Sequence, residues 1–393
     1  MPTTPYAGND EFANEIPLPD DTDDASVYDA AFEVALDRTR WIYNRLARLA
    51  ARTWLALQTH TQALIAGAWD AKGDQWYGIG SASNDLMATS PDQGVTWSTI
   101  SPGGASVALQ SVACDNAAHV VATGFTTAFG LNAYQFDGSA WHTVGVLVAG
   151  NCTLAEVAWE PTVGLWAIYA WDNGSAPKTF RLFTSPDRAT WTERTASIPA
   201  VMQDSAGTQN QPRIGVGGGR IMLVNFYGGQ FHASSCAASA PTVWTTAASI
   251  TPFMATPTAV SDPLYNADLD RWIVSVTGTA TTTGAEIWAS DDHGVTWQRI
   301  KSIGGTTFSW PMTIIRSLGG RLVIGMRDTG LTAYSTDFGT TWYPGPKIGT
   351  SAATARNLVA GDGNFLELDT GGGSNGAQVS IAAGDPNTVA MGT

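Results

Sequence analysis

An aspartate and a tryptophan recur in this chain at a fixed spacing. Three segments match the pattern Ser-x-Asp-x-Gly-x-Thr-Trp at every fixed position, beginning at Ser90, Ser290 and Ser335. An aspartate placed in this way can accept backbone N–H groups of its own turn, and glycine supplies a left-handed backbone conformation that other residues adopt at a cost. We call this pattern the box, and we expect its aspartates to stabilise turns rather than to catalyse reactions or bind calcium.

The box residues follow a regular series along the chain. The full matches are Ser90, Asp92, Gly94, Thr96 and Trp97; Ser290, Asp292, Gly294, Thr296 and Trp297; and Ser335, Asp337, Gly339, Thr341 and Trp342. A fourth box, with Ser185, Asp187 and Trp191, is one residue shorter and lacks the glycine. The segment 137–141 resembles this short form, and Trp244 follows a more degenerate turn. Successive tryptophans of this series lie 44 to 53 residues apart, a period that indicates a repeat architecture.

Other residues capable of chemistry are scattered. The histidines (His60, His119, His142, His232 and His293) show no paired metal-ligand spacing. The 3 cysteines are too few for a disulfide framework or a thiolate metal site. The glycine runs 217–219 and 371–373 do not lead into helices, so phosphate binding is not expected there. The sequence therefore predicts no metal and no cofactor.

The elements around each box are short β segments. Around the box at Ser290, the stretches at 256–263, 271–278 and 285–292 indicate short β segments, and turn residues separate them. Four strands in a period of 40–50 residues are typical of a β-propeller blade. The repeats run over 62–100, 106–146, 153–197, 211–248, 257–301, 310–346 and 352–390. We therefore predict an all-β propeller over residues 61–393 with seven blades, or alternatively six, whose last blade lacks the box because the ring closes there.

The box pattern resembles the Asp-box, or BNR, repeat of sialidases and of many propellers that are not sialidases. The resemblance covers most of the chain and implies the propeller fold, but one scaffold hosts unrelated activities. A sialidase is expected to use three arginines on a carboxylate, a tyrosine paired with a glutamate, and an aspartate. The propeller holds many arginines, Arg213 and Arg316 among them, and five glutamates, including Glu156 and Glu286. The Arg-Ile-Pro-like motif expected before the first box is missing, and its nearest fragment, 211–214, has the wrong order and place. We therefore expect no catalytic residue, with a sialidase-like glycoside hydrolase as an alternative.

The N-terminal region differs from the rest of the chain. Residues 1–24 carry seven acids and no base, which predicts an extended arm, and residues 25–60 carry five arginines and three acids. Residues 26–59 contain no glycine or proline and predict one long amphipathic helix. Its apolar stripe includes Phe32, Ile42, Leu46 and Leu49, and Arg38, Arg45 and Arg52 repeat every seven residues. We interpret this helix as a self-associating coiled coil, with packing on its own propeller or on a membrane surface as alternatives.

A second resemblance concerns this N-terminal region. The residues 16–19, 25–27 and 33–38 (Ile-Pro-Leu-Pro, Ala-Ser-Val and Glu-Val-Ala-Leu-Asp-Arg) look like the start of many tailed-phage fibre and spike proteins. In that family a short acidic arm precedes a helix that attaches or trimerises the fibre. The resemblance implies a homo-oligomer, preferably a trimer, with the arm contacting other proteins of the particle. The Tyr and Asp that follow Val27, and the strongly acidic arm, depart from the family pattern.

The charge and composition of the chain restrict the classes of molecule that it is expected to bind. The formal net charge of −14 disfavours nucleic acid, and no apolar stretch is long enough to insert into a membrane. The N-terminus has no secretory signal, so we expect synthesis in a host cytoplasm and incorporation into a virion or phage-like particle. Propeller loops rich in aromatic residues suit a surface glycan or a host receptor; the rings considered are Trp159, Trp166, Trp171, Tyr227, Trp288, Trp310 and Tyr343. The expected function is a structural and host-attachment protein, and a cytoplasmic assembly or scaffold factor is the alternative.

Overall fold

A computed structural model describes the chain from residue 54 to residue 383 with gaps. The described ranges are 54–59, 64–80, 87–92, 96–100, 107–126, 130–138, 141–150, 152–174, 179–203, 212–254, 257–278, 285–303, 314–318, 322–326, 332–344, 356–361, 364–369 and 378–383. The predicted arm, most of the predicted helix with Phe32, Arg38, Ile42, Arg45, Leu46, Leu49 and Arg52, and the box residue Gly94 lie outside these ranges.

The described strands pair into seven antiparallel sheets. The first three sheets are β2 (Leu64–Asp70), β3 (Gln75–Gly80), β4 (Met87–Ser90) and β5 (Ser98–Ile100); β6 (Val107–Cys114), β7 (Val120–Thr126), β8 (Leu131–Phe136) and β9 (Trp141–Val148); and β10 (Cys152–Glu160), β11 (Leu165–Asp172), β12 (Thr179–Ser185) and β13 (Thr192–Glu193). A short 3₁₀ helix, η1 (Thr195–Ser197), and one helical turn, α2 (Ala200–Gln203), follow the third sheet.

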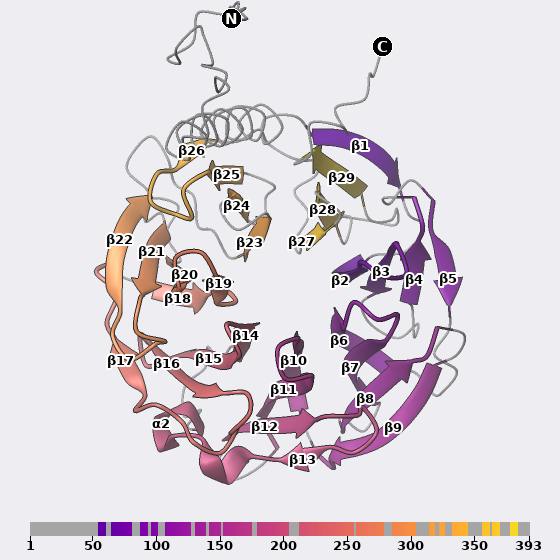
Figure 1. Ribbon diagram of the computed structural model, residues 1–393, viewed down its shortest axis with the longest axis horizontal. Coiled ribbons are helices and arrows are strands. Elements are labelled where there is room, and N and C mark those ends of the chain that lie inside the picture. Colours follow the sequence, from indigo (N-terminus) through magenta and orange to yellow (C-terminus); the bar gives the residue numbers. More distant parts are fainter. Residues whose placement is uncertain are drawn as a thin grey trace, which may run out of the picture.

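The remaining sheets continue in the same order. They are β14 (Arg213–Gly217), β15 (Arg220–Tyr227), β16 (Gln230–Ala237) and β17 (Ala248–Ile250); β18 (Pro257–Val260), β19 (Leu264–Asn266), β20 (Arg271–Gly278), β21 (Ala285–Ser290) and β22 (Gln298–Ile303); β23 (Ile314–Leu318), β24 (Leu322–Met326), β25 (Thr332–Ser335) and β26 (Tyr343–Pro344); and β27 (Arg356–Gly361), β28 (Asn364–Asp369) and β29 (Gln378–Ala383) with β1 (Trp54–Thr59). The seven sheets are arranged in a ring, with β2, β6, β10, β14, β23 and β27 toward its centre (Figure 1). In a β-propeller such inner strands surround a central channel. The all-β propeller expected from the sequence is confirmed.

The residue types of each strand match its position in the sheet. The second and third strands are covered on both faces by neighbouring sheets, so they are almost continuously buried, as in β20, where seven of eight residues are buried. The outer strand β22 is mostly exposed and carries Gln298, Arg299 and Lys301. Some buried polar residues lie at strand ends, such as Ser90, Ser290 and Ser335, whereas others, such as Asn225 and Ser275, lie within the inner strands.

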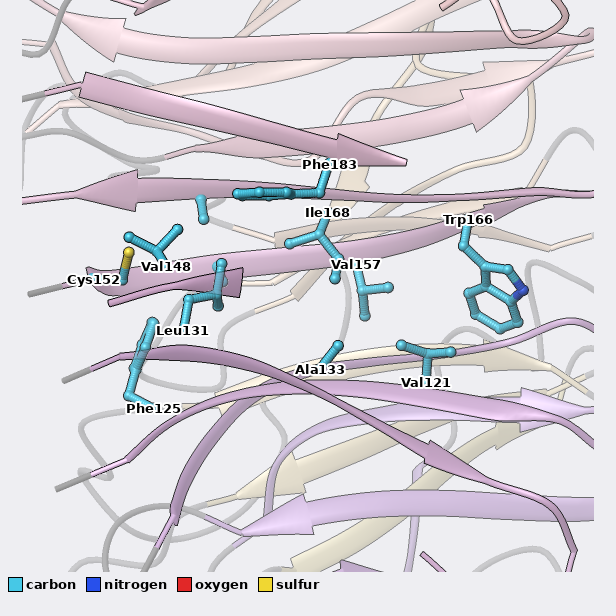
Figure 2. Packing of buried hydrophobic residues seen from close by; sticks show 12 residues of the cluster. Val121, Phe125, Leu131, Ala133, Val148, Cys152, Val157, Trp166, Ile168 and Phe183 are labelled. Atoms are coloured by element: carbon cyan, nitrogen blue, oxygen red, sulfur yellow. The ribbon is translucent and has the colours of Figure 1, made fainter. Parts of the chain in front are cut away.

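Hydrophobic cores lie between adjacent sheets. One such core joins Val121, Phe125 and Leu131 of the second sheet to Trp166 and Ile168 of the third, and Figure 2 shows these side chains interdigitating. Its residues are nearly all fully buried. Because each sheet packs on two neighbours, stability is distributed around the ring rather than concentrated in one core.

The last sheet corrects part of the sequence-based prediction. Residues 54–59 were expected to end the long helix, but they form strand β1, which pairs antiparallel with β29 from Trp54↔Ala382 to Thr59↔Gln378. The helix prediction is therefore wrong over its last six residues, and the propeller begins at Trp54 rather than at residue 61. Leucine and alanine favour a helix, but the unpaired edge of β29 offers backbone partners to this segment, and this long-range pairing overrides a weak local preference.

Candidate binding site

The box turns connect the third and fourth strands of their sheets, as expected. In the fifth sheet, Asp292 Oδ1 accepts hydrogen bonds from Ser290 Oγ at 2.9 Å and from Thr296 N at 2.8 Å, and its other oxygen accepts from Thr296 Oγ1. Asp92 makes the same set of contacts with Ser90 and Thr96. Each carboxylate is therefore occupied by its own turn.

The backbone explains the glycine of the pattern. Gly294 and Gly339 have φ values of +89° and +88°, in the left-handed region that glycine adopts without strain. Their N–H groups donate to Ser290 Oγ and Ser335 Oγ, both at 2.7 Å. At Gly294 an added Cβ would also lie 2.6 Å from Met222 Cε of the preceding sheet, so the end of that flexible side chain would have to move.

The shorter box keeps the aspartate but not the glycine. Asp187 Oδ1 accepts from Ala189 N at 3.0 Å and from Thr190 N at 2.7 Å, and Ser185 Oγ donates to it at 3.1 Å. Arg188, with φ of +66°, corresponds to His293 and Phe338 of the full boxes, which are also left-handed, and the left-handed glycine that follows them is missing. The third sheet thus reaches the same hydrogen-bonded end point with one residue fewer.

The box tryptophans act on the neighbouring sheet. Trp297 packs against the core that contains Met222 and Phe231 of the fourth sheet, and Trp342 packs against Ile273 and Ile287 of the fifth. Trp97 lies against Val359, Leu366 and Leu368 of the last sheet. The indole N–H of Trp191, Trp244, Trp297 and Trp342 each donates to the backbone oxygen three residues earlier, at 2.8 to 3.1 Å. These contacts assign the box residues a structural role in joining each sheet to the one before it.

A cluster of four charged side chains links the inner parts of four successive sheets. Arg213, the first residue of β14, donates from Nη1 to Glu156 Oε1 of β10 at 2.5 Å and to Asp262 Oδ1 at 3.3 Å. Arg316 of β23 contacts Asp262 Oδ2 at 2.6 Å. The four side chains are between 19% and 26% exposed, so solvent in the channel reaches them. We call Glu156, Arg213, Asp262 and Arg316 the channel network.

Backbone groups hold the network in place. Ile214 N donates to Glu156 Oε2 at 3.1 Å, and Arg213 Nε donates to Val260 O at 3.0 Å. Enclosure between the inner strands, together with the negative charge of Asp262, raises the pKa of Glu156 to about 8 against the opposing effect of Arg213. Burial would raise the pKa of Asp262, but Arg316 and Arg213 outweigh it and the pKa of Asp262 is lowered. The network therefore gains or loses a proton near neutral pH at Glu156.

A cavity opens beside this network. It has a volume of about 170 Å³ and is lined by Gln110, Leu154, Ala155, Glu156, Pro212 and Arg213. The innermost strands on either side are irregular here, because the β6–β7 pairing shifts register at Gln110 and the β10–β11 pairing shifts at Thr153. Such bulges redirect side chains and are frequent beside binding sites. The arrangement offers a small pocket of mixed polarity, in which Leu154, Ala155 and Pro212 adjoin a carboxyl group and a guanidinium.

The structure brings some of the residues considered for chemistry together and buries others. Arg213, Arg316 and Glu156, considered for a sialidase-like site, do come together, but in the geometry described here both arginines are held by carboxylates of the chain itself. Asp262 and Gln110 were not singled out from the sequence, because they lie far from Glu156 and Arg213 along the chain and approach them only in the fold. Of the rings considered for stacking, Trp166 and Trp288 are buried, while Trp310 lies outside the described residues. Within the described ranges no three His, Cys, Asp or Glu residues are grouped as a metal site would require, and no helix is long and apolar enough to cross a bilayer.

Comparisons with known proteins report the fold. No protein-family model matches the chain, and no curated protein sequence matches it. It is similar to the solved structure of YCF48 bound to a D1 peptide, with a TM-score of 0.57 and 13% identity over 86% of this chain and 97% of that one. It is also similar to YCF48 from Cyanidioschyzon merolae, with a TM-score of 0.55 and 13% identity over 84% and 97% of the two chains. At this identity the likeness shows a shared β-propeller fold.

Proposed function

We propose that this chain is a seven-bladed Asp-box propeller that serves as a non-enzymatic attachment protein of a phage or phage-like particle. In this proposal the N-terminal arm and helix anchor and trimerise the protein, and the propeller binds a host receptor or surface glycan. The observation that carries the binding role is the cavity beside the channel network, where polar and charged groups converge next to a bulged strand.

The sheet topology supports anchoring at one end of the propeller and ligand binding at the other. The first and third strands of a sheet run in the same direction, so the box turns lie where the inner strands end. Trp54 pairs with Ala382 near the end of β29, the third strand of its sheet, so the segment before β1 joins the propeller at this box end. The cavity residues Gln110, Leu154 and Arg213 instead lie in the first halves of their strands. Anchoring at one end leaves the other end open to a partner.

The binding role is tested at Arg213. Full-length protein and its Arg213→Ala variant are applied to glycan arrays and to whole bacterial cells, with folding monitored by thermal unfolding. We expect the variant to lose at least tenfold in binding, since it removes the guanidinium that faces the cavity. Arg271→Ala is the matched control, because Arg271 pairs with Asp291 beside a box turn at the other end. Equal binding by folded Arg213→Ala and by wild type would contradict the proposed site.

A second candidate is an assembly factor that holds a peptide. It is favoured by one observation, that a propeller of similar fold was solved with a D1 peptide bound. A peptide array applied under the same conditions separates the two: saturable, Arg213-dependent binding of peptides, with none to cells or glycans, would support the assembly role instead.

A further inference from the structure

An exposed aromatic ring stands on the outer part of the fifth sheet. Phe253, in the connection between β17 and β18, is 70% exposed, although a phenylalanine ring is costly to leave in water. Its ring lies parallel to that of Trp288, at an interplanar angle of 6° and a centroid separation of 5.7 Å. The guanidinium carbon of Arg299 lies 4.1 Å from the Phe253 ring centroid.

Both partners of the ring project from the same face of the sheet. Trp288 of β21 and Arg299 of β22 are direct cross-strand partners, so their side chains project from the same face of the sheet. Phe253 contacts both of them, with its ring stacked on the indole and close to the guanidinium, and most of the residue stays exposed. A 70% exposed fraction is consistent with this arrangement.

A buried carboxylate fixes the arrangement. Glu286, whose side chain is 4% exposed, accepts hydrogen bonds from Phe253 N at 3.1 Å and from Trp288 Nε1 at 3.0 Å. Its other oxygen accepts from Arg299 Nη1 at 3.3 Å. One side chain thus holds the loop backbone, the indole and the guanidinium, so the exposed ring is pre-organised and loses little conformational entropy when it binds.

We propose that Phe253, supported by Trp288 and Arg299, is a stacking platform for a neutral pyranose ring. The axial C–H groups of a sugar are polarised toward the face of an aromatic ring, and the hydroxyl groups at its rim need hydrogen-bonding partners. Arg299 is 36% exposed, and the exposed pair Gln230–Thr251 adds uncharged polar groups two residues from Phe253. Aromatic, cationic and amide groups close together suit a hydroxylated ligand.

The surroundings favour a sugar over a protein partner. A stable protein interface needs an apolar centre of several side chains. In the described part of the chain, the other exposed large apolar residues lie on β9 or in turns at the box end; they are Val146, Val163, Val243, Leu269 and Val295. Phe253 instead lies in a connection at the end where the inner strands begin, the end that carries the cavity. The platform therefore deepens the proposed function, on which it rests, by assigning it a ligand class and a second contact point.

The test uses saturation-transfer NMR with methyl β-D-glucopyranoside and full-length protein. We expect millimolar binding, typical of one stacked sugar, with the strongest transfer at the axial ring protons. Phe253→Ala should weaken it about tenfold, and Phe253→Tyr should preserve it. Val243→Ala is the control, since Val243 is equally exposed but lies at the box end. Absence of transfer to the wild type, or undiminished transfer to folded Phe253→Ala, would overturn the proposal.

The experiments distinguish a failure of the Phe253 platform from a failure of the site at Arg213. The part of the glucoside signal that depends on Phe253 should persist in Arg213→Ala, because Arg213 lies on an innermost strand and Arg299 on an outer strand. Loss of cell binding in Arg213→Ala combined with a Phe253-independent glucoside signal would reject the platform alone. A Phe253-dependent signal combined with unchanged cell binding by Arg213→Ala would support the platform and reject the channel site.

Discussion

At the scale of single residues, the aspartates of this chain differ in what surrounds them. Asp292 lies in an exposed turn and is satisfied by its own Ser290 and Thr296. Desolvation alone would raise its pKa, but the hydrogen bonds from Thr296 and Ser290 outweigh it and the pKa of Asp292 is lowered. Asp262 is paired with arginines from the two neighbouring sheets, Arg213 and Arg316. A carboxylate held by its turn is part of the fold, whereas one held by distant strands is available for rearrangement with a ligand.

Replacing Asp292 with alanine should lower stability without changing ligand binding. The turn would lose its acceptor for Thr296 N, which in an exposed loop costs about 1 kcal/mol in the free energy of unfolding. Because the folded-state pKa of Asp292 is lowered, its contribution is present above the unfolded pKa near 4 and disappears as the pH falls through the folded value. Urea unfolding at several pH values measures the effect. Loss of binding at unchanged stability would assign Asp292 a functional role.

Replacing Glu156 with glutamine should change the pH dependence of stability. The folded-state pKa of Glu156, about 8, exceeds its usual value, so the folded protein binds a proton more tightly than the unfolded chain. Wild-type stability therefore falls as the pH rises between these two values, and Glu156→Gln removes that fall. The stability of the variant relative to wild type should rise between about pH 5 and about pH 8. A difference that stays constant over this interval would mean that Glu156 is ionised throughout.

At the scale of elements, β1 closes the ring. It supplies the fourth strand of the last sheet from the other end of the sequence, so the first and last described strands are hydrogen-bonded neighbours. The propeller therefore holds residues near both ends of its sequence together, and separating them requires breaking a whole ladder.

Removing β1 should destabilise the propeller strongly. A chain beginning at residue 61 lacks Trp54–Thr59 and leaves the edge of β29 unpaired, whereas a chain beginning at residue 54 keeps the sheet complete. We expect the shorter chain to melt several degrees lower and to aggregate through the exposed edge. Thermal unfolding and light scattering on both chains provide the measurement. Equal melting temperatures would show that β1 contributes little to closure.

Strand β1 shows which features of the fold could be predicted from the sequence and which could not. The boxes, their position between the third and fourth strands and the structural use of Asp92 and Asp292 could be predicted, because turn chemistry is local. The pairing of Trp54–Thr59 with β29 could not, since it joins segments separated by more than 300 residues and conflicts with a helical pattern. Phe253 was missed for a related reason: its exposure depends on Glu286, Trp288 and Arg299, which are distant in sequence and adjacent only in the fold.

At the scale of the whole molecule, the propeller has two unlike ends. The box turns and the entry of the chain into β1 share one end, and the cavity and Phe253 lie toward the other. A trimer tied together at the box end would present three binding ends in the same direction. Three sites that reach the same surface bind it with an avidity far above the affinity of one site.

The trimer is tested at Leu46, on the apolar stripe predicted from the sequence and outside the described residues. Full-length protein should have about three times the mass of one chain by light scattering, because the apolar stripe of residues 26–53 needs a partner to be buried. Leu46→Asp places a charge in that seam and should yield a monomer whose thermal unfolding matches that of the chain beginning at residue 54. The monomer should lose the avidity of the trimer. Its binding to cells should therefore fall by a larger factor than its affinity for a single sugar. A Leu46→Asp protein of unchanged mass would remove the coiled coil, and a wild-type monomer would favour a single-chain assembly factor.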